Sequence, residues 1–363
     1  MTVAEYRGTG RSVTGATRST SAGIGGVLER IPTAWWVVGI VLLFMPVVAG
    51  NFVLYQIFGW AFILGMIALS LMFLGGYGGM VSLAQMSIAG LAGYMVAILG
   101  PSGVSTISLH WPWWLNIPVA ILIAAIFATM IGALAVRTEG IYTIMITLAI
   151  AAAFFYFTRQ NYTIFNGYTG FANVVPPELF GINWRTPVPF YYLSLGCAAI
   201  SYFVVLYVSR SPFGLALQGV RDNPRRMAAL GFNVFAHRVF AYTFAAVIAA
   251  VAGILLVWQN AMISPGTAGL PAVIDILVIA IVGGIKRPIG PFIGALIYVV
   301  LRTFSPDILT SLSLPGDRFK LLIGLGFLAV VYWSPDGVLG LWDRWRERRA
   351  KQRDPLTGQG GSS

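Results

Sequence analysis

The stretch from Gly75 to Leu99, GGYGGMVSLAQMSIAGLAGYMVAIL, is apolar along most of its length but opens with two glycine pairs around a tyrosine. Glycine is a poor helix former, so these first five residues cannot hold a regular helix well. Ser82, Gln85 and Ser87 then bring polar groups into an otherwise apolar segment. Small and polar residues in such a run are typical of an interrupted helix that is buried in protein within a membrane.

This stretch has two interpretations, and the sequence leaves both open. In the first, the glycines allow neighbouring helices to pack closely, and the hydroxyl groups bond back to their own backbone. In the second, the interruption and its polar side chains line a path through the membrane.

The composition of the whole chain supports a membrane location. Of its 363 residues 58% are hydrophobic and only 10% are charged, whereas a soluble globular protein has about 25% charged residues. The formal net charge is +11, which in a soluble protein would point to nucleic acid. Here the basic residues lie in short connections and near the two ends of the sequence, as expected where they set membrane orientation.

About ten segments are candidates for membrane spans, because a hydrocarbon layer about 30 Å thick requires roughly 20 residues of helix. The eighth and ninth are short and flank the Gly/Pro-rich sequence GGIKRPIGP, so they form two short spans, a re-entrant pair or a broken helix. We therefore predict an all-α polytopic membrane protein with about ten transmembrane helices, some of them broken or re-entrant. The candidate segments are approximately residues 34–50, 53–74, 81–99, 113–136, 140–158, 189–209, 238–258, 272–285, 290–303 and 318–334.

The basic residues also predict how these spans are oriented. With a cytoplasmic N-terminus and every segment crossing, the positive-inside rule places both termini in the cytoplasm. The connection between residues 159 and 187 then lies on the other side, where we expect a short structured cap. In this arrangement the cytoplasmic side holds all of the 23 Lys and Arg residues except Arg159, Arg185, Arg302, Arg318 and Lys320.

The two ends of the chain are polar and lack apolar periodicity. Residues 1–33 are basic and rich in Gly and Ser, and residues 343–363 are basic and then Gly/Ser-rich, so we expect disordered tails there. Residues 34–342 form the predicted transmembrane domain. Its first apolar run begins only near Ala34, so we expect a retained span rather than a cleavable signal peptide.

Few residues are available for catalysis or metal binding. The sequence has neither the G-x-x-x-x-G-K-[ST] motif for phosphate binding nor the HExxH motif for metal binding. Its single cysteine, Cys197, lies in an apolar run, and its two histidines, His110 and His237, lie in connections. Ionisable groups are nearly absent from the spans, so we expect neither an enzyme nor a chain that binds a cofactor of its own.

Asp275, in the sequence PAVIDILVIAIVGG, is the most prominent charge within a predicted span. An aspartate at the bilayer centre costs roughly 2.5–3.5 kcal/mol on insertion scales, so it should face protein or water. It has two interpretations. It lies at the outer mouth of a transport path, or it interacts with the free backbone N–H groups at a helix N-terminus.

A second unusual stretch, GLALQGVRDNPRRMAALGFNVFAHR at residues 214–238, concentrates charge between two apolar spans. A positive-inside anchor would explain the arginines alone. It would not explain a capped helix with an apolar face of Met227, Ala228 and Leu230, which a docking helix for a cytoplasmic partner does explain. The short helix is predicted over residues 225–230, with Asp222 or Asn223 as its cap, Pro224 in its first position and Gly231 after its end.

Within this loop, RDNPRRMAALGF resembles the cytoplasmic coupling segment of permeases from ATP-binding-cassette (ABC) importers. It is most similar to the branched-chain amino acid permease family of the LivM type, which has urea and amide permeases as relatives. The similar residues are Arg221, Asp222, Asn223, Leu230 and Gly231, whereas Pro224, Arg225 and Arg226 depart from the family's pattern.

Four further stretches resemble the same family in order and spacing, and together they cover about residues 35–345. They are GGYGGMVSLAQMSIAGLAGY, LAVRTEGIYTIMITLA, ISPGTAGLPAVIDILVIAIVGGIKRPIGPFIGA and WSPDGVLGL. Met80 and Lys286 stand where the family usually has glutamine and glycine.

The resemblance implies the permease subunit of an importer for branched-chain amino acids, or for urea and amides. Residues 210–238 would couple it to ATP hydrolysis by its partners. The implied coupling residues are Arg221, Asp222, Asn223, Pro224, Ala229, Leu230 and Gly231. The implied residues of the translocation path are Ser82, Gln85, Ser87, Tyr142, Thr147 and Asp275.

The implied partners are a homologous permease subunit, two cytoplasmic ABC ATPase subunits that bind ATP and Mg, an extracytoplasmic solute-binding protein and membrane lipid, but no nucleic acid. The implied location is the bacterial cytoplasmic (inner) membrane, with multiple spans. The alternative is an ATP-independent secondary transporter or channel for a small polar solute, although nearly charge-free spans leave few groups for ion coupling.

Overall fold

The structure is a computed structural model of the chain, in two units of residues 1–44 and 45–363. The described part of the first unit belongs to α2 (Thr33–Val48), whose last residues fall in the second unit. The two predicted tails and the predicted span at 318–334 lie almost entirely outside the described residues. The described residues are 33–104, 107–177, 181, 183–311, Gly324, Leu325, Leu328, Gly337 and Gly340.

Within those residues, five helical stretches are long and apolar enough to cross a membrane. α2 and three later helices contribute shorter apolar stretches. The described part of the chain therefore confirms a helical membrane fold, but it does not confirm ten full spans. The long stretches are Val53–Tyr77, α5 (Trp113–Ala135), α6 (Ile141–Gln160), α7 (Pro187–Arg210) and α10 (Val234–Asn260). The shorter helices are α4 (Gln85–Leu99), α11 (Leu270–Gly283) and α12 (Gly290–Ser311), and Val53–Tyr77 comprises η1 (Val53–Gly59), α3 (Trp60–Met72) and η2 (Phe73–Tyr77).

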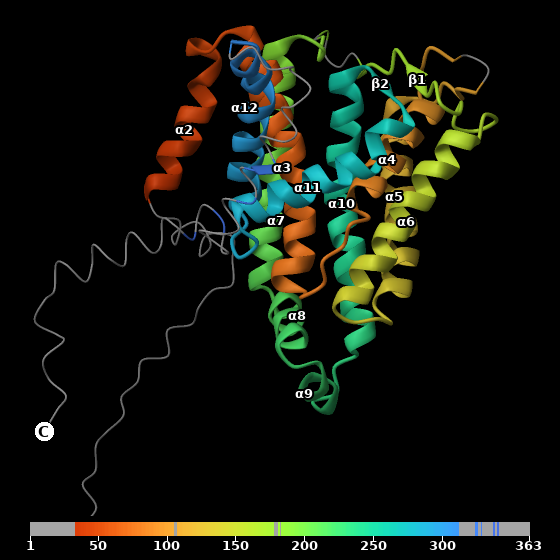
Figure 1. Ribbon diagram of the computed structural model, residues 1–363, viewed down its shortest axis with the longest axis vertical. Helices are drawn as coiled ribbons and strands as arrows, with labels where there is room; N and C mark the ends of the chain where they lie inside the picture. The colour runs from red at the N-terminus through yellow and green to blue at the C-terminus, as the bar shows by residue number, and fades with distance from the viewer. Residues whose placement is uncertain are drawn as a thin grey trace, which may run out of the picture. The chain divides into compact units, whose positions relative to one another are not determined.

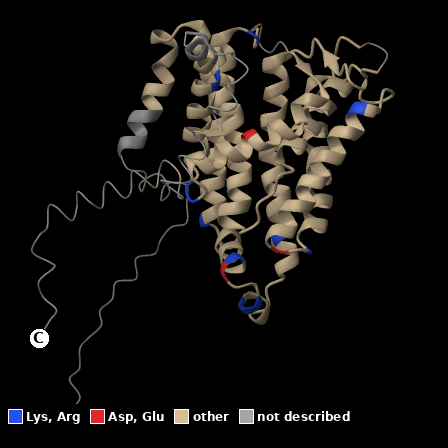
Figure 2. Ribbon diagram, viewed as in Figure 1, with Lys and Arg blue, Asp and Glu red and all other residues tan. Residues whose placement is uncertain are grey.

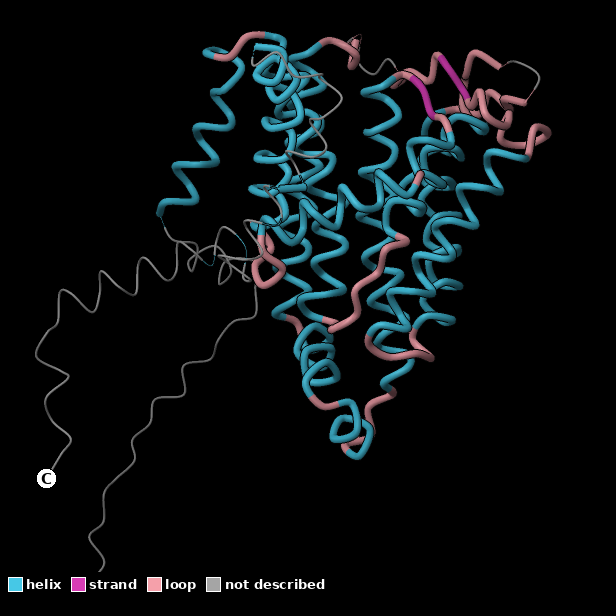
Figure 3. Tube along the Cα trace, viewed as in Figure 1, coloured by secondary structure: helices cyan, strands magenta, loops and turns pink. Residues whose placement is uncertain are grey.

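The predicted span at residues 81–99 is wrong in its extent, because α4 begins only at Gln85. At 1.5 Å per residue α4 reaches about 22 Å, short of a hydrocarbon layer about 30 Å thick. The chain before it bends at Gly79, whose φ of +68° favours glycine. Residues 78–84 then run inside the bundle as a loop (Figure 3). α4 is therefore a half-length helix with nearly all of its side chains buried.

Helices α3 and α10 form the centre of the second unit. α10 packs against α4, α5 and α3, and α3 also packs against α12 and α11 (Figure 1). Glycine allows the closest approach, since a Cβ at Gly253 of α10 would overlap the backbone of Ala89 in α4. α11 runs across its neighbours rather than along them (Figure 1). α11 packs mainly against α12 and α3, and its buried residues lie mostly in its second half.

The connection at residues 159–187 forms the predicted structured cap in its described part. Strand β1 (Phe171–Ala172) pairs antiparallel with β2 (Met262–Ile263), which follows α10. Phe171 lies opposite Ile263, and Ala172 lies opposite Met262. A 3-10 turn, η3 (Pro265–Ala268), then leads into α11. The cap thus fixes the chain just before the helix that carries Asp275.

Basic residues gather at the end of the second unit where α8 (Pro212–Asp222) and α9 (Pro224–Ala229) lie (Figure 2). At the same end, Arg238 of α10 forms an ion pair with Glu139, which lies between α5 and α6, at 3.7 Å. This asymmetry agrees with the positive-inside pattern of the sequence. The cytoplasmic position of both termini stays a prediction.

Candidate functional site

Two short helices at the basic end, α8 and α9, form what we call the α8–α9 hairpin. The predicted helix at 225–230 is confirmed as α9, with Pro224 in its first position. Helix α8 was not predicted, although Ser211 before it and Pro212 in its first position repeat the cap-and-proline pattern of Asn223 and Pro224. Capping side chains start all three helices in this region. Ser211 accepts from Gly214 N at 3.3 Å, Asn223 from Arg226 N at 3.0 Å and Asn233 from Ala236 N at 3.0 Å.

The end of α9 is also defined by its sequence. Gly231 has a φ of +88°, and nothing lies within 4 Å of where its Cβ would be. Gly231 N donates to Ala228 O at 3.0 Å, and Phe232 N donates to Met227 O at 3.1 Å. This pattern satisfies carbonyl groups that would otherwise lack partners at the helix end. The predicted role of Gly231 after the helix is therefore confirmed.

The predicted apolar face of Met227, Ala228 and Leu230 divides into one packed residue and two exposed ones. Met227 packs on α8, where a Cβ at Gly219 would lie 2.9 Å from the methionine sulfur. Leu230, just after the end of α9, is 67% exposed, and Ala228 and Ala229 are exposed as well. Of the predicted apolar face, only this exposed part is accessible to a partner.

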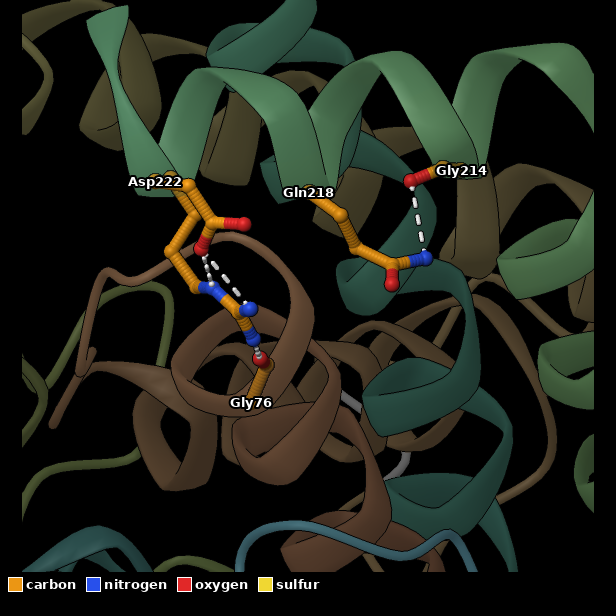
Figure 4. Close-up of polar contacts among 5 residues, drawn as sticks. Gly76, Gly214, Gln218 and Asp222 are labelled. Atoms are coloured by element: carbon orange, nitrogen blue, oxygen red, sulfur yellow. Dashed lines mark hydrogen bonds and ion pairs between the residues drawn. The ribbon is translucent and has the colours of Figure 1, made fainter.

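Two side chains fix α8 to the rest of the protein. Gln218 donates from Nε2 to Ser209 O at 3.0 Å and to Gly214 O at 3.1 Å, which ties α8 to the end of α7. Arg221 donates from Nη1 to the carbonyl oxygen of Gly76, at the end of η2, and from Nε to Asp222 at 2.9 Å. Figure 4 shows the guanidinium group between Asp222 and Gly76. The hairpin is therefore joined to the glycine-rich stretch of η2.

Four of the predicted path residues are buried around the start of α4. Ser82, Gln85, Ser87 and Thr147 are each at most 1% exposed. Thr147 Oγ1 accepts a hydrogen bond from Leu83 N at 3.1 Å, which joins α6 to the loop at residues 78–84. These residues form what we call the buried polar cluster.

The hydrogen bonds of this cluster are incomplete. Gln85 Oε1 accepts from Ser70 at 3.1 Å, and Thr147 donates back to Thr143 O of its own helix at 3.0 Å. Gln85 Nε2 and Ser87 Oγ have no hydrogen-bond partner among the described residues. Buried polar atoms without partners are costly, so packing alone does not account for this cluster. A role for it in a path stays a prediction.

The other two predicted path residues lie apart from the cluster. Tyr142 is 66% exposed on α6, so the structure does not bring it to the buried polar cluster. Asp275 is half-buried and lies beyond the first turn of α11, which contains no acidic residue. The free N–H groups of a helix are those of its first four residues. Asp275 is therefore not a cap of α11.

Asp275 lines a cavity of about 620 Å³ between α3, α10, α11 and α12, which we call the α11–α12 pocket. Tyr298 and Arg302, four residues apart on α12, line it too. The hydroxyl group of Tyr298 lies close enough to Asp275 and Arg302 for the charges of both to act on it. The Arg302 guanidinium also lies 5.3 Å from the centre of the Trp60 ring. The pocket thus offers one carboxylate, one guanidinium and aromatic walls.

Sequence reasoning did not find Trp60, Tyr298 and Arg302 as parts of this site. Arg302 had only been counted among the basic residues outside the cytoplasm. A tyrosine and an arginine at i and i+4 in an apolar helix share one face, which was the available signal. The contact with Gly76 was also missed, because nothing local in the sequence connects it to Arg221.

The chain matches the family described as "Branched-chain amino acid transport system / permease component" over residues 53–331. It is 24% identical to the high-affinity branched-chain amino acid transport system permease protein LivM of Escherichia coli, in an alignment of 283 residues that covers 69% of this chain and 65% of that protein. It is 30% identical to the permease protein BraD of Pseudomonas aeruginosa, in an alignment of 169 residues that covers 45% of this chain and 52% of that protein.

A further relative is the ribose import permease protein RbsC of Haemophilus influenzae, at 24% identity over 58% of this chain and 67% of that protein. The alignment with the LivM protein covers 65% of that protein, so the chain spans less than two thirds of its length. No solved structure matches the chain. Because the family match covers most of its residues, the chain belongs to the family of branched-chain amino acid transport system permease components.

Proposed function

We propose that this chain is the transmembrane permease subunit of an ABC importer in the bacterial inner membrane. The α8–α9 hairpin carries this proposal, because it forms a capped, basic and exposed tip at one end of a helical membrane unit. The sequence has no phosphate-binding motif of its own, so ATP and Mg would be bound by partner ATPase subunits. Membership of the permease family supports the same assignment.

The tip of the hairpin indicates what kind of surface the ATPase presents. Leu230 and Ala229 offer an exposed apolar contact, and Arg225 and Arg226 are exposed beside them. A cleft with an apolar floor and an acidic rim would complement these residues. A homologous permease subunit would form the other half of the pore, and an extracytoplasmic binding protein would deliver the solute.

The α11–α12 pocket supports a zwitterionic solute with an apolar side chain. Asp275 would bind the ammonium group and Arg302 the carboxylate, while Trp60, Leu64 and Leu256 supply apolar walls. Relatives of the chain are named for branched-chain amino acids, ribose and autoinducer 2. A sugar has no charge for these two side chains, so we propose leucine-like amino acids as the solutes.

The docking role is tested with Leu230→Asp in proteoliposomes that contain the whole importer. An aspartate in place of an exposed side chain does not disturb packing, so the variant should assemble in the membrane. We expect it to lose most ATP-driven leucine uptake and most stimulated ATP hydrolysis, because it places a charge in the apolar contact. Leu230→Met is the matched control and should behave as the native chain. Uptake at the native rate by Leu230→Asp, or leucine uptake without ATP, would refute the proposal.

The solute assignment is tested with Asp275→Asn and Arg302→Gln. A charge-assisted hydrogen bond contributes about 1.5–3 kcal/mol, so each change should raise KM for leucine uptake about 10-fold or more. Arg159→Gln, which removes an arginine outside the pocket, is the control. Native KM for leucine in both pocket variants, or ribose uptake by the native importer in place of leucine, would contradict the assignment.

A further inference from the structure

Arg221 belongs to the α8–α9 hairpin, but its side chain is directed into the membrane unit. Its Nη1 donates to Gly76 O, and its Nε and Nη2 hold Asp222 Oδ1 at 2.9 and 2.8 Å. Each nitrogen of the guanidinium group thus interacts with an oxygen atom of this chain. Arg221 is exposed, as Arg225 and Arg226 are, but its guanidinium group is already bound within the chain and is therefore less available to a partner.

The glycine pairs after α3 are shaped to receive this arginine. Gly79 has a φ of +68°, and a Cβ there would lie 2.6 Å from Arg221 Cγ. Any larger residue would displace the aliphatic part of the arginine, and it would also adopt a strained backbone conformation. The stem of Arg221 therefore packs on Gly79 while its guanidinium binds Gly76.

The same glycine stretch touches a second break in the helices. A Cβ at Gly76 would overlap the carbonyl oxygen of Ile285, which lies in the turn between α11 and α12. The side chain of Ile285 lies 3.5 Å from the corresponding position at Gly75. A continuous line of contacts thus runs from Arg221 through residues 75–79 to the turn at residues 284–289. That turn ends α11, the helix that carries Asp275.

We propose that Arg221 is a positioning residue that transmits movement of the α8–α9 hairpin to the two helix breaks and so to the α11–α12 pocket. This inference rests on the proposed function, because it assumes that an ATPase moves the hairpin. Glycine breaks are the places where helices can change direction without loss of packed side-chain contacts. The rigid guanidinium group of Arg221 is bound to the glycine break at residues 75–79. It therefore transfers a displacement of the hairpin that a flexible side chain would absorb.

The test uses Arg221→Lys in the complete importer, with binding protein, ATP and L-leucine in proteoliposomes. Lysine keeps the charge but cannot bind Gly76 and Asp222 together. We expect stimulated ATP hydrolysis to stay within about twofold of the native rate, and leucine taken up per ATP to fall at least about fivefold. Arg137→Lys, an exposed arginine outside the hairpin, should change neither value. Arg225→Ala should lower ATP hydrolysis and leucine uptake together, as expected when a residue that contacts the ATPase is removed.

A second measurement distinguishes a residue that transmits movement of the hairpin from one that only stabilises the fold. Hydrogen exchange of the peptide covering residues 283–290 should differ between nucleotide-free and ATP-bound native importer. In Arg221→Lys this difference should disappear, while exchange in the nucleotide-free state stays native. The same ATP-dependent difference in the variant, or a proportional fall of hydrolysis and uptake, would overturn the inference. Absence of ATP-driven uptake by the native importer would instead overturn the proposed function.

Discussion

The central stretch Val53–Tyr77 and the peripheral helix α5 have similar mean hydropathy but very different surroundings. In the most apolar part of Val53–Tyr77 89% of the residues are buried inside the protein, compared with 33% in α5 and 28% in each of α6 and α7. In lipid an exposed leucine is not penalised, because acyl chains are as apolar as its side chain. Hydropathy therefore identifies a membrane helix, but it does not say whether protein or lipid surrounds it.

Small residues lie where one helix packs closely against another. A Cβ added at Gly65 of α3 would lie 2.6 Å from the Phe292 ring of α12. A Cβ at Gly253 of α10 would likewise meet the backbone of Ala89. In contrast, Gly196 of α7 has nothing within 4 Å of its Cβ position. Glycine thus permits close contact between helices at Gly65 and Gly253, and also at Gly132, where α5 meets Tyr242 of α10, whereas Gly196 of α7 makes no such contact.

The largest effect should come from substituting valine for glycine in each group. Gly253→Val would force α10 away from α4, since a backbone cannot move aside as a side chain can. We expect a loss of more than about 4 kcal/mol of unfolding free energy and little monodisperse protein in detergent. Gly196→Val should change the free energy of unfolding by at most about 0.5 kcal/mol. Comparable yields and melting temperatures for the two variants would contradict the difference in packing between Gly253 and Gly196.

An intermediate effect should follow from shortening a leucine in each group. Leu69 of α3 is fully buried, whereas Leu122 of α5 is 58% exposed. Leu69→Ala leaves a cavity and should cost about 2–4 kcal/mol. In Leu122→Ala lipid fills the space, so the cost should stay below about 1 kcal/mol. The midpoint of unfolding in mixed micelles with increasing sodium dodecyl sulfate measures both. An equal shift would show that α5 is packed against a partner.

The smallest effect should come from removing single hydroxyl groups. Thr147→Val deletes the acceptor for Leu83 N and should destabilise the loop before α4 by about 1 kcal/mol. Ser194 of α7 donates only to Tyr191 O of its own helix, so Ser194→Ala is the matched control and should be nearly neutral. Faster hydrogen exchange at residues 80–84 in Thr147→Val alone would support this difference. If both variants exchange equally there, the threonine has no special role.

The hairpin could be predicted from sequence because helix boundaries are set by neighbours in the chain. Asn223, Pro224 and Gly231 each act within one turn, and the structure has α9 where they indicate it. The glycine pairs at residues 75–79 likewise indicated an interrupted helix. Prediction was less successful for the span expected at residues 81–99, because α4 is apolar but shorter than that span, whereas the short α11 agrees with the short segment expected there.

The pocket and the arginine contact could not be predicted in the same way. Asp275 was recognised because a charge in an apolar run is conspicuous, but Trp60 and Arg302 reach it from distant parts of the chain. The bond from Arg221 to Gly76 joins residues 145 positions apart. Such contacts depend on how helices are arranged in space, which periodicity and hydropathy do not specify.

The half-length helix α4 has a consequence for the way the protein is made. Its 15 residues are too few to be held across the bilayer by their own hydrophobicity as the chain leaves the ribosome. Its main neighbour α10 is synthesised only after α5 to α9. Until then the polar side chains of Gln85 and Ser87 lack the surroundings that later enclose them. Insertion of α4 should therefore be delayed until α10 has been made, and truncated chains that end before α10 should leave it accessible to water.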